Sequence, residues 1–398
     1  MSDESPLLIE HLGQLSEALR IVFVYDNNNL DSNGLDRSTA LLVQGLQRRG
    51  HEISLIRTKS NVKDNLIFDE DFDDGLIKKS SLVSRSLKLG WPTTTELTNL
   101  WLIRRPDLVF VSAEGSLGWS AIKSARKLKI PSVTDIRGKF KTHKLTHKPV
   151  SKLLRGAVMA YLRKFHNSSQ RTLVQSNELK RQLSELGFEN LEVVPYGVDT
   201  ELFTPAKRSD ALRASWGCDS STRVLLYFSQ GKKDKHLKWL TQLVLKTKSI
   251  RIPLKLVVIS SSLDKDPRRV RSDSIYVVPA LKNSDLCEYL ASSDLMLAPS
   301  NFESASQEII ESMASGLPIL WQSKADRNKV LINDVNCFMV ESDNESDYLK
   351  RLLNIVERAE LLKSIGSNAR QSAMSYEWNF LVENFESIFR AVSKRHPY

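Results

Sequence analysis

The sequence predicts an α/β protein made of two similar halves, each a parallel sheet with helices between its strands. Short apolar runs bounded by turn residues alternate with amphipathic helical patterns in both halves. No apolar run approaches the roughly 20 residues that a membrane-spanning helix needs. At 398 residues, the chain is long enough to bury two ordinary domain cores.

Composition narrows the class of protein further. The formal net charge of +10 suggests an anionic partner without naming one. The three cysteines, Cys218, Cys287 and Cys337, are widely spaced, have no metal-binding spacing, and are typical of a reducing compartment. The acidic start Met1–Pro6 has no signal-peptide pattern. We therefore expect a cytoplasmic protein.

The first half begins with a β-loop-α-β unit. Residues 20–25 form an apolar strand, residues 40–49 a helix that Gly50 ends, and residues 51–56 a second strand. Such units build parallel sheets. Gly34, at the mouth of this helix, would let a phosphate or sugar approach the backbone, although a simple turn glycine is the competing interpretation.

The next segment continues the alternation. We expect a strand at 107–112, a loop at 114–118, a helix at 121–128 and a strand at 131–134. The acidic stretch 68–75 contains overlapping Asp-x-Asp patterns that hold metals in some enzymes. No strand follows it, so we interpret it as a solvated turn.

Residues 136–177 contain no acidic residue, and we call them the basic window. Apolar side chains recur in it at helical spacing: Val150, Leu153, Leu154, Val158 and Leu162. Its cations are the ten Lys or Arg residues at 137, 139, 141, 144, 148, 152, 155, 163, 164 and 171. This pattern predicts a basic amphipathic surface that binds an anionic membrane. Nucleic acid is the competing partner, but no nucleic-acid-binding motif is recognisable.

The second half repeats the pattern after a crossing segment at 193–205. Its expected strands are 223–229, 254–260, 275–278, 295–298 and 319–321. The lysine-rich turn 230–236 follows the first of them, where ligands bind in open α/β sheets. A last amphipathic helix at 378–392 would place on its apolar side Phe380, Leu381, Phe385, Ile388 and Phe389.

The stretch 299–318 carries the most specific pattern. Ser304 and Gln307 have capping-box spacing at the start of a helix, and Gly316 stands where a left-handed C-terminal cap belongs. A strand, a turn and a helix N-terminus make an anion site. Glu303 and Glu311 beside it would suit hydroxyls of a nucleotide sugar. Alternatively, Glu303 only complements the helix dipole and Glu311 is a solvated charge.

The spacing Glu303-x7-Glu311, followed by residues 313–318, resembles the signature of retaining, nucleotide-sugar-dependent glycosyltransferases of the GT-B fold, family 4. Further matching segments are 49–53, 105–109, 114–118, 161–167, 197–203 and 212–217. They resemble the subgroup of lipid-directed mannosyl- and glucosyltransferases, which is similar to sulfoquinovosyl-diacylglycerol synthases. This resemblance implies two facing Rossmann-like domains with a central cleft, a donor in the C-terminal half, an acceptor in the N-terminal half, and retention without a metal.

The resemblance also assigns site residues and exposes departures. The family's glycine loop maps to Gly34, and its diphosphate lysine maps to Lys235. Its diphosphate arginine is replaced by Gln230, and its histidine near the reacting sugar is replaced by Arg137. Lys232 and Lys233 lie in the same turn as Gln230 and would supply charge. The family's Phe-Gly pair is Ala305–Ser306 in this chain.

These patterns predict a hexosyltransferase with domains at 1–203 and 204–376 and a C-terminal helix, 377–398, that packs back on the first domain. Glu311 would bind ribose and Glu303 sugar hydroxyls. Lys235 and the amides of Ser304, Ala305, Ser306 and Gln307 would stabilise charge on the leaving diphosphate. We expect a UDP- or GDP-sugar donor, a glycan or lipid-linked acceptor, no metal, no nucleic acid, and a place on the inner membrane face. The alternatives are a catalytically silent relative and a sugar-nucleotide epimerase.

Overall fold

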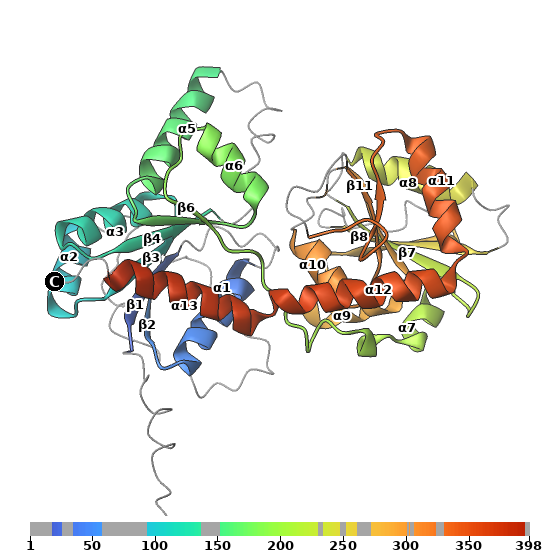
Figure 1. Cartoon of the computed structure of the whole chain (residues 1–398), viewed down its shortest axis with the longest axis horizontal. Helices are drawn as coiled ribbons and strands as arrows, with labels where there is room; N and C mark the ends of the chain where they lie inside the picture. Colours follow the sequence, from blue (N-terminus) through green and yellow to red (C-terminus); the bar gives the residue numbers. More distant parts are fainter. Residues whose placement is uncertain are drawn as a thin grey trace, which may run out of the picture.

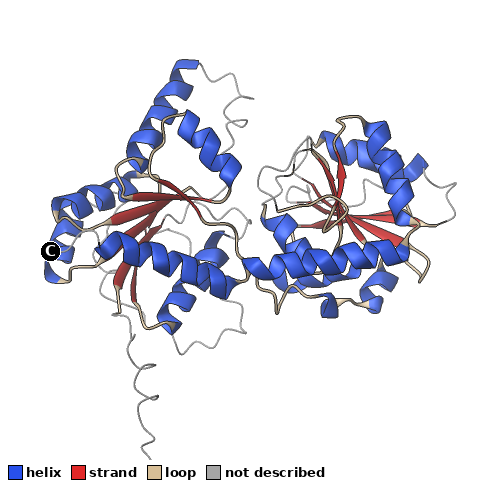
Figure 2. Ribbon diagram, viewed as in Figure 1, coloured by secondary structure: helices blue, strands red, loops and turns tan. Residues whose placement is uncertain are grey.

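The computed structural model describes residues 18–25, 35–57, 94–136, 152–229, 234–246, 252–260, 272–300, 302, 306–323 and 330–394. These residues form two parallel sheets of six strands each, and helices pack around both sheets (Figures 1 and 2). The predicted α/β fold with two sheets is confirmed.

The first sheet has the strand order β2-β1-β3-β4-β5-β6. Its strands are β1 (Arg20–Tyr25), β2 (Glu52–Arg57), β3 (Leu108–Ser112), β4 (Ser132–Asp135), β5 (Arg171–Val174) and β6 (Leu191–Val193). The helices between them are α1 (Leu35–Arg48), α2 (Thr94–Ile103), α3 (Ser116–Lys127), α5 (Lys152–His166) and α6 (Asn177–Glu185). Each strand pair is parallel, as the β-loop-α-β pattern predicts.

The second sheet has the order β12-β11-β10-β7-β8-β9. Its strands are β7 (Arg223–Ser229), β8 (Leu254–Ser260), β9 (Ile275–Pro279), β10 (Leu295–Ala298), β11 (Ile319–Gln322) and β12 (Phe338–Val340). Its helices are η2 (Pro205–Lys207), α7 (Asp210–Ser215), α8 (Lys235–Lys246), α9 (Asn283–Ser292), α10 (Gln307–Ala314), α11 (Glu345–Val356) and α12 (Ala359–Ala373). After it, η5 (Met374–Tyr376) leads into α13 (Trp378–Lys394).

One predicted loop is wrong, because Ser116 to Gly118 already belong to α3. The reason for the glycine is steric. A Cβ at Gly118 would lie 1.7 Å from the carbonyl oxygen of Ala113, so only glycine lets the helix begin this close to the end of β3. The tight turn leaves Glu114 at the carboxyl edge of the sheet.

The last helix packs against the first sheet although it follows the second one in the chain (Figure 1). Phe385 and Phe389 of α13 lie in one core with Phe23 and Phe110, and the rings of Phe110 and Phe389 are 5.6 Å apart. Full burial of each such ring contributes about 1.5–3 kcal/mol. The sequence placed Phe380 on this apolar side, but its side chain is 53% exposed.

A partly buried ionic cluster also joins α13 to the first sheet. Glu386 accepts hydrogen bonds from Arg49 and from Arg390. The Nε2 atom of His51 lies 3.3 Å from Glu386 Oε1, while its Nδ1 accepts a hydrogen bond from the Leu19 backbone. Burial lowers the pKa of His51 despite the nearby carboxylate. Burial raises the pKa of Glu386, but the bonds from Arg390 and Arg49 outweigh it and leave that pKa below its usual value.

The His51 shift predicts that the protein loses stability on acidification from about pH 7.5, and the Glu386 shift adds a further loss only below about pH 5.5. A folded pKa below the unfolded value means that the unfolded chain takes up the proton first. His51 therefore contributes stability above its unfolded pKa of 6.5 and loses that contribution as the pH falls. In thermal melts across this range, the melting temperature of His51→Gln should fall less steeply with decreasing pH than that of the parent. Equal slopes would contradict the role of His51.

Candidate functional site

Two strand ends of the second sheet form the structural frame of the candidate donor site. β10 and β7 are hydrogen-bonded neighbours although β8 and β9 separate them in sequence. From β7 the strands β8 and β9 are added on one side, and from β10 onward strands are added on the other side. Ligands of open α/β sheets bind at such a switch point. α8 follows β7 and α10 follows β10, so two helix N-termini meet the same edge. Helix N-termini favour anions.

The turn after β7 is organised by Asp234, which the sequence analysis did not single out. Its Oδ1 accepts hydrogen bonds from the backbone N–H groups of His236 and Leu237, at 3.0 and 3.2 Å. Its Oδ2 accepts from Tyr227 Oη at 2.7 Å and from Ser229 Oγ at 3.1 Å. The carboxylate caps α8 and ties it to β7. An Asp just before the helix was the available signal.

Lys235 is the first residue of α8, and its side chain is exposed at this edge of the sheet. The cap on Asp234 therefore fixes the backbone from which Lys235 extends. Its position fits a cation that meets an anionic ligand at the switch point. The other residues of this turn in the predicted site, Gln230, Lys232 and Lys233, lie outside the described residues.

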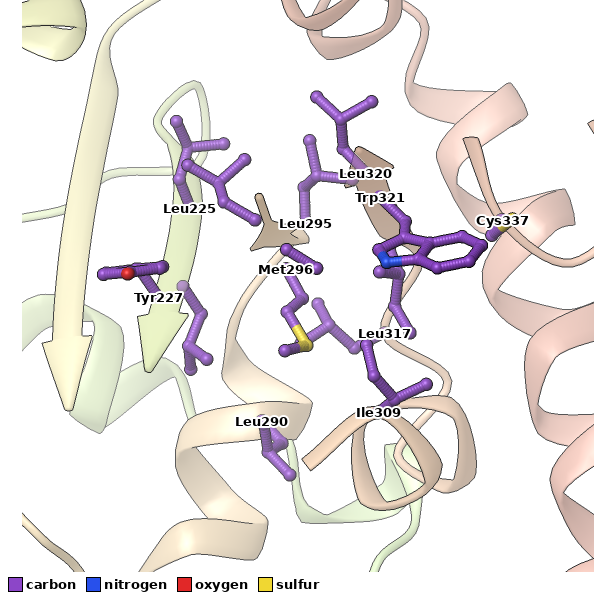
Figure 3. Packing of buried hydrophobic residues seen from close by; sticks show 14 of the residues in the cluster. Leu225, Tyr227, Leu290, Leu295, Met296, Ile309, Leu317, Leu320, Trp321 and Cys337 are labelled. Carbon is purple, nitrogen blue, oxygen red and sulfur yellow. The ribbon is translucent and has the colours of Figure 1, made fainter. Parts of the chain in front are cut away.

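The segment that leads from β10 to α10 is held by Phe302. Its carbonyl accepts a hydrogen bond from Trp321 Nε1 on β11, at 3.1 Å. Its ring lies 6.1 Å from the ring of Tyr227. Figure 3 shows Trp321 above Ile309 and Leu317 in the core beneath this edge. Glu303 follows Phe302 directly but lies outside the described residues, as do Ser304 and Ala305.

The start of α10 differs from the predicted capping box. The helix begins at Gln307 and its N-cap is Ser306, whose side chain makes no capping hydrogen bond. Ser304, the predicted cap, lies outside the described residues. Several serines precede the first apolar turn, and the capping pattern alone does not distinguish between them. The predicted left-handed cap is confirmed, since Gly316 has a φ of 69°.

Glu311 is buried in α10, with 6% of its surface exposed. Its interpretation as a solvated surface charge is therefore wrong. The carboxylate accepts a hydrogen bond from Gln307 Nε2 at 2.8 Å. A buried carboxylate is stable only with such partners. The helix thus carries, one turn from its N-terminus, an acceptor that can receive further hydroxyl donors.

The first sheet has a matching switch point between β1 and β3. Glu114 follows β3 there and remains 44% exposed in its side chain. Its Oε1 lies 3.3 Å from Nε2 of the fully buried His166, and Nδ1 of that ring lies 3.0 Å from Thr134 Oγ1. Gly34 and Arg137 flank this edge in sequence but lie outside the described residues.

The basic window is helical from Lys152 to His166, as its spacing predicts. Its apolar residues, however, do not form a free face along the whole helix. Met159 and Leu162 pack against a cluster that contains Val174 and Phe188. Arg163 and Lys164 are exposed, and so are Ala157, Ala160 and Tyr161, so the described part of this surface presents both charge and apolar area. None of the helices that the structure describes is long and apolar enough to span a membrane.

Comparisons with known proteins agree with this geometry. The model for Glycosyltransferase Family 4 matches residues 32–202, and the model for Glycosyl transferases group 1 matches residues 222–358. A GDP-mannose-dependent alpha-mannosyltransferase of Corynebacterium glutamicum is 26% identical over 77% of this chain and 73% of its own length. The enzyme of the same description from Mycolicibacterium smegmatis is 23% identical over 95% of this chain and 98% of its own.

Solved structures share the fold. Anabaena HepE, crystallised with UDP and glucose, superposes with a TM-score of 0.63 over 94% of this chain and 100% of its own, at 14% identity. This likeness extends across both sheets and both switch points.

Proposed function

Because this chain belongs to the family 4, group 1 glycosyltransferases and acts on nucleotide sugars, we propose that it transfers a hexose to a glycan or lipid-linked acceptor. The observation that carries this proposal is the buried Glu311, one turn from the N-terminus of α10, at a switch point where α8 also begins. That combination suits a ligand with both a diphosphate and a diol.

Each donor group has a proposed partner. Glu311 accepts hydrogen bonds from the ribose hydroxyls, and Glu303 holds hydroxyls of the transferred sugar. Lys235, Lys232, Lys233 and the N–H groups at the start of α10 stabilise charge on the diphosphate as the bond to the anomeric carbon breaks. The nucleotide is UDP or GDP. This set of cations and amides leaves no step that requires a metal.

The acceptor approaches from the first sheet, which residues 1–203 build with the help of the last helix, 377–398. The second domain, 204–376, presents the donor. The acceptor hydroxyl oxygen bonds to the anomeric carbon on the face from which the diphosphate departs, and its proton passes to the leaving diphosphate oxygen, so configuration is retained.

Incubation with UDP- and GDP-hexoses, with and without candidate acceptors, tests the proposal. We expect acceptor-dependent release of nucleoside diphosphate, unchanged by EDTA, and a product whose anomeric proton coupling matches that of the donor. A coupling constant typical of the opposite anomer would contradict retention. If an epimerised nucleotide sugar forms without acceptor, the protein is an epimerase and the proposed transfer is wrong.

We further propose that the basic window places the protein on the inner face of an anionic membrane. Each Lys or Arg near such a surface contributes about 1 kcal/mol, and salt screens the attraction. In flotation assays, vesicles that contain an anionic lipid should carry the protein at low salt and release it at about 0.5 M salt. Equal flotation with neutral vesicles, or no effect of salt, would assign the charge to another anion.

A further inference from the structure

The side chain of Gln307 joins two parts of the chain that the proposed function does not connect. Its Nε2 donates one hydrogen bond to Glu311 Oε1, at 2.8 Å, and one to the carbonyl oxygen of Gly197, at 3.1 Å. An amide nitrogen has two hydrogens, so these two bonds use both. Gly197 lies 110 residues earlier, in the segment that leads from the first sheet to the second.

The accepting carbonyl is held in place from its other side. A Cβ at Gly197 would lie 2.8 Å from Leu381 Cδ2 and 3.0 Å from the ring of Trp378, so the backbone presses directly on α13. The next residue, Val198, donates to the carbonyl of Tyr376 at 2.8 Å and accepts from Trp378 N at 3.3 Å. The chain passes between the two sheets twice, at Gly197–Val198 and at Tyr376–Trp378, and these two segments lie side by side. The side chain of Gln307 contacts the first of them.

A second contact holds the other end of α10 to residues 197–203, the linker that leads from the first sheet to the second. Arg370 donates to the carbonyl of Ala314, the last residue of α10, and to the carbonyls of Thr200 and Phe203. Both ends of the helix that carries Glu311 are thereby attached to residues 197–203. Movement of this linker would be transmitted to the carboxylate.

An ordinary helix pair does not account for this arrangement. Gln182 makes the same kind of bond to Glu178, at 2.9 Å, on the exposed surface of α6. Such exposed pairs four residues apart stabilise a helix only slightly. The pair in α10 differs because Glu311 is buried and because Gln307 has a second partner outside its own helix.

We propose that Gln307 is a positioning residue. It fixes the orientation of the Glu311 carboxylate for the donor and couples the position of this carboxylate to the linker between the two sheets. The proposal rests on the proposed role of Glu311 in binding ribose. With Oε1 held by the Gln307 amide, the carboxylate keeps one orientation, in which its oxygens accept hydrogen bonds from the ribose hydroxyls. Gln307 itself need not touch the donor.

Calorimetry with UDP and GDP on four proteins tests this: the parent, Gln307→Leu, Glu311→Gln and the double variant. In the parent background, Gln307→Leu should weaken binding of the preferred nucleotide about tenfold. In the Glu311→Gln background the same change should have less than about a twofold effect, because the group that Gln307 positions is already altered. With the sugar donor, KM should rise about tenfold and kcat should stay within about threefold.

Gln182→Leu is the matched control and should leave nucleotide binding unchanged. If Gln307→Leu does not fold, Gln307→Asn, which is too short to reach both partners, should shift binding in the same direction. Equal effects of Gln307→Leu in both backgrounds, or none, would overturn this inference alone. No effect of Glu311→Gln on nucleotide binding would overturn the proposed role of Glu311 together with it.

Discussion

Replacing Arg137 by alanine should reduce the rate of sugar transfer a few hundredfold. The family places an arginine on the leaving diphosphate, and this chain has the neutral Gln230 there. Loss of one fixed donor at such a position costs about 3–4 kcal/mol in the transition state. Arg137 stands where the resembled family has a histidine, so this chain has an additional cation there. Its guanidinium stays charged at any physiological pH and binds phosphate through a planar fork. Because a guanidinium is a poor proton acceptor, the role we propose for Arg137 is to stabilise the leaving group or to bind an anionic acceptor.

Related variants separate charge from geometry. Arg137→Lys keeps the charge without the fork and should recover part of the rate. Joint replacement of Lys232 and Lys233 by alanine should also reduce turnover strongly, whereas Gln230→Arg should change it only modestly. Arg163→Ala removes an exposed arginine from the same basic window and serves as the control. Steady-state rates with a donor that the parent uses provide the comparison.

One pattern of results would reverse the interpretation. If turnover appears only when Gln230→Arg and Arg137→His are combined, Arg137 does not compensate for the lost arginine. The chain would then be a degenerate relative that is kept for binding. A parent without turnover on any common donor would lead to the same conclusion.

The parallel strands were predictable from sequence because both faces of these sheets are covered. Every residue of β8 is buried, and such strands read as continuous apolar runs. Three short strands escaped notice: β5, whose four residues lie in the basic window, and β6 and β12, which have three residues each. Phe380 was misplaced for a different reason. Successive helix residues differ by about 100°, so Phe380 lies on the side opposite the middle of the buried stripe, which contains Leu381, Phe385 and Phe389.

The candidate site was predictable only in part. The pattern of residues 304–316 predicted a helix that carries Glu311, because that relation is local, and α10 confirms it. The bond from Gln307 to Gly197 and the bond from Trp321 to Phe302 depend on how distant segments pack. No periodicity encodes such pairs. Asp234 was predictable from helix-capping rules, but the lysines around it are the more conspicuous feature of the turn.

Glu311→Gln should weaken binding of nucleoside diphosphate about ten- to a hundredfold, while the protein still folds. A hydrogen bond to a charged acceptor contributes roughly 1.5–3 kcal/mol, and the neutral amide replaces the carboxylate that the ribose hydroxyls use. The fold should survive because glutamine has nearly the same shape. Its carbonyl oxygen can still accept the bond from Gln307, so the buried position keeps its partner. Calorimetry with UDP and GDP measures the affinity, and a thermal melt verifies folding.

Glu308→Gln is the control for this change. Glu308 lies on the same helix, in its first turn, and its substitution removes the same charge from α10. If the macrodipole or the net charge of the helix governed affinity, both variants would weaken binding by a similar factor. A specific contact with ribose predicts a large effect for Glu311→Gln alone, and a smaller effect for a 2′-deoxy nucleotide than for the parent nucleotide. A folded Glu311→Gln protein with parental affinity would exclude the ribose role and leave the buried carboxylate to be explained by its contacts within the protein.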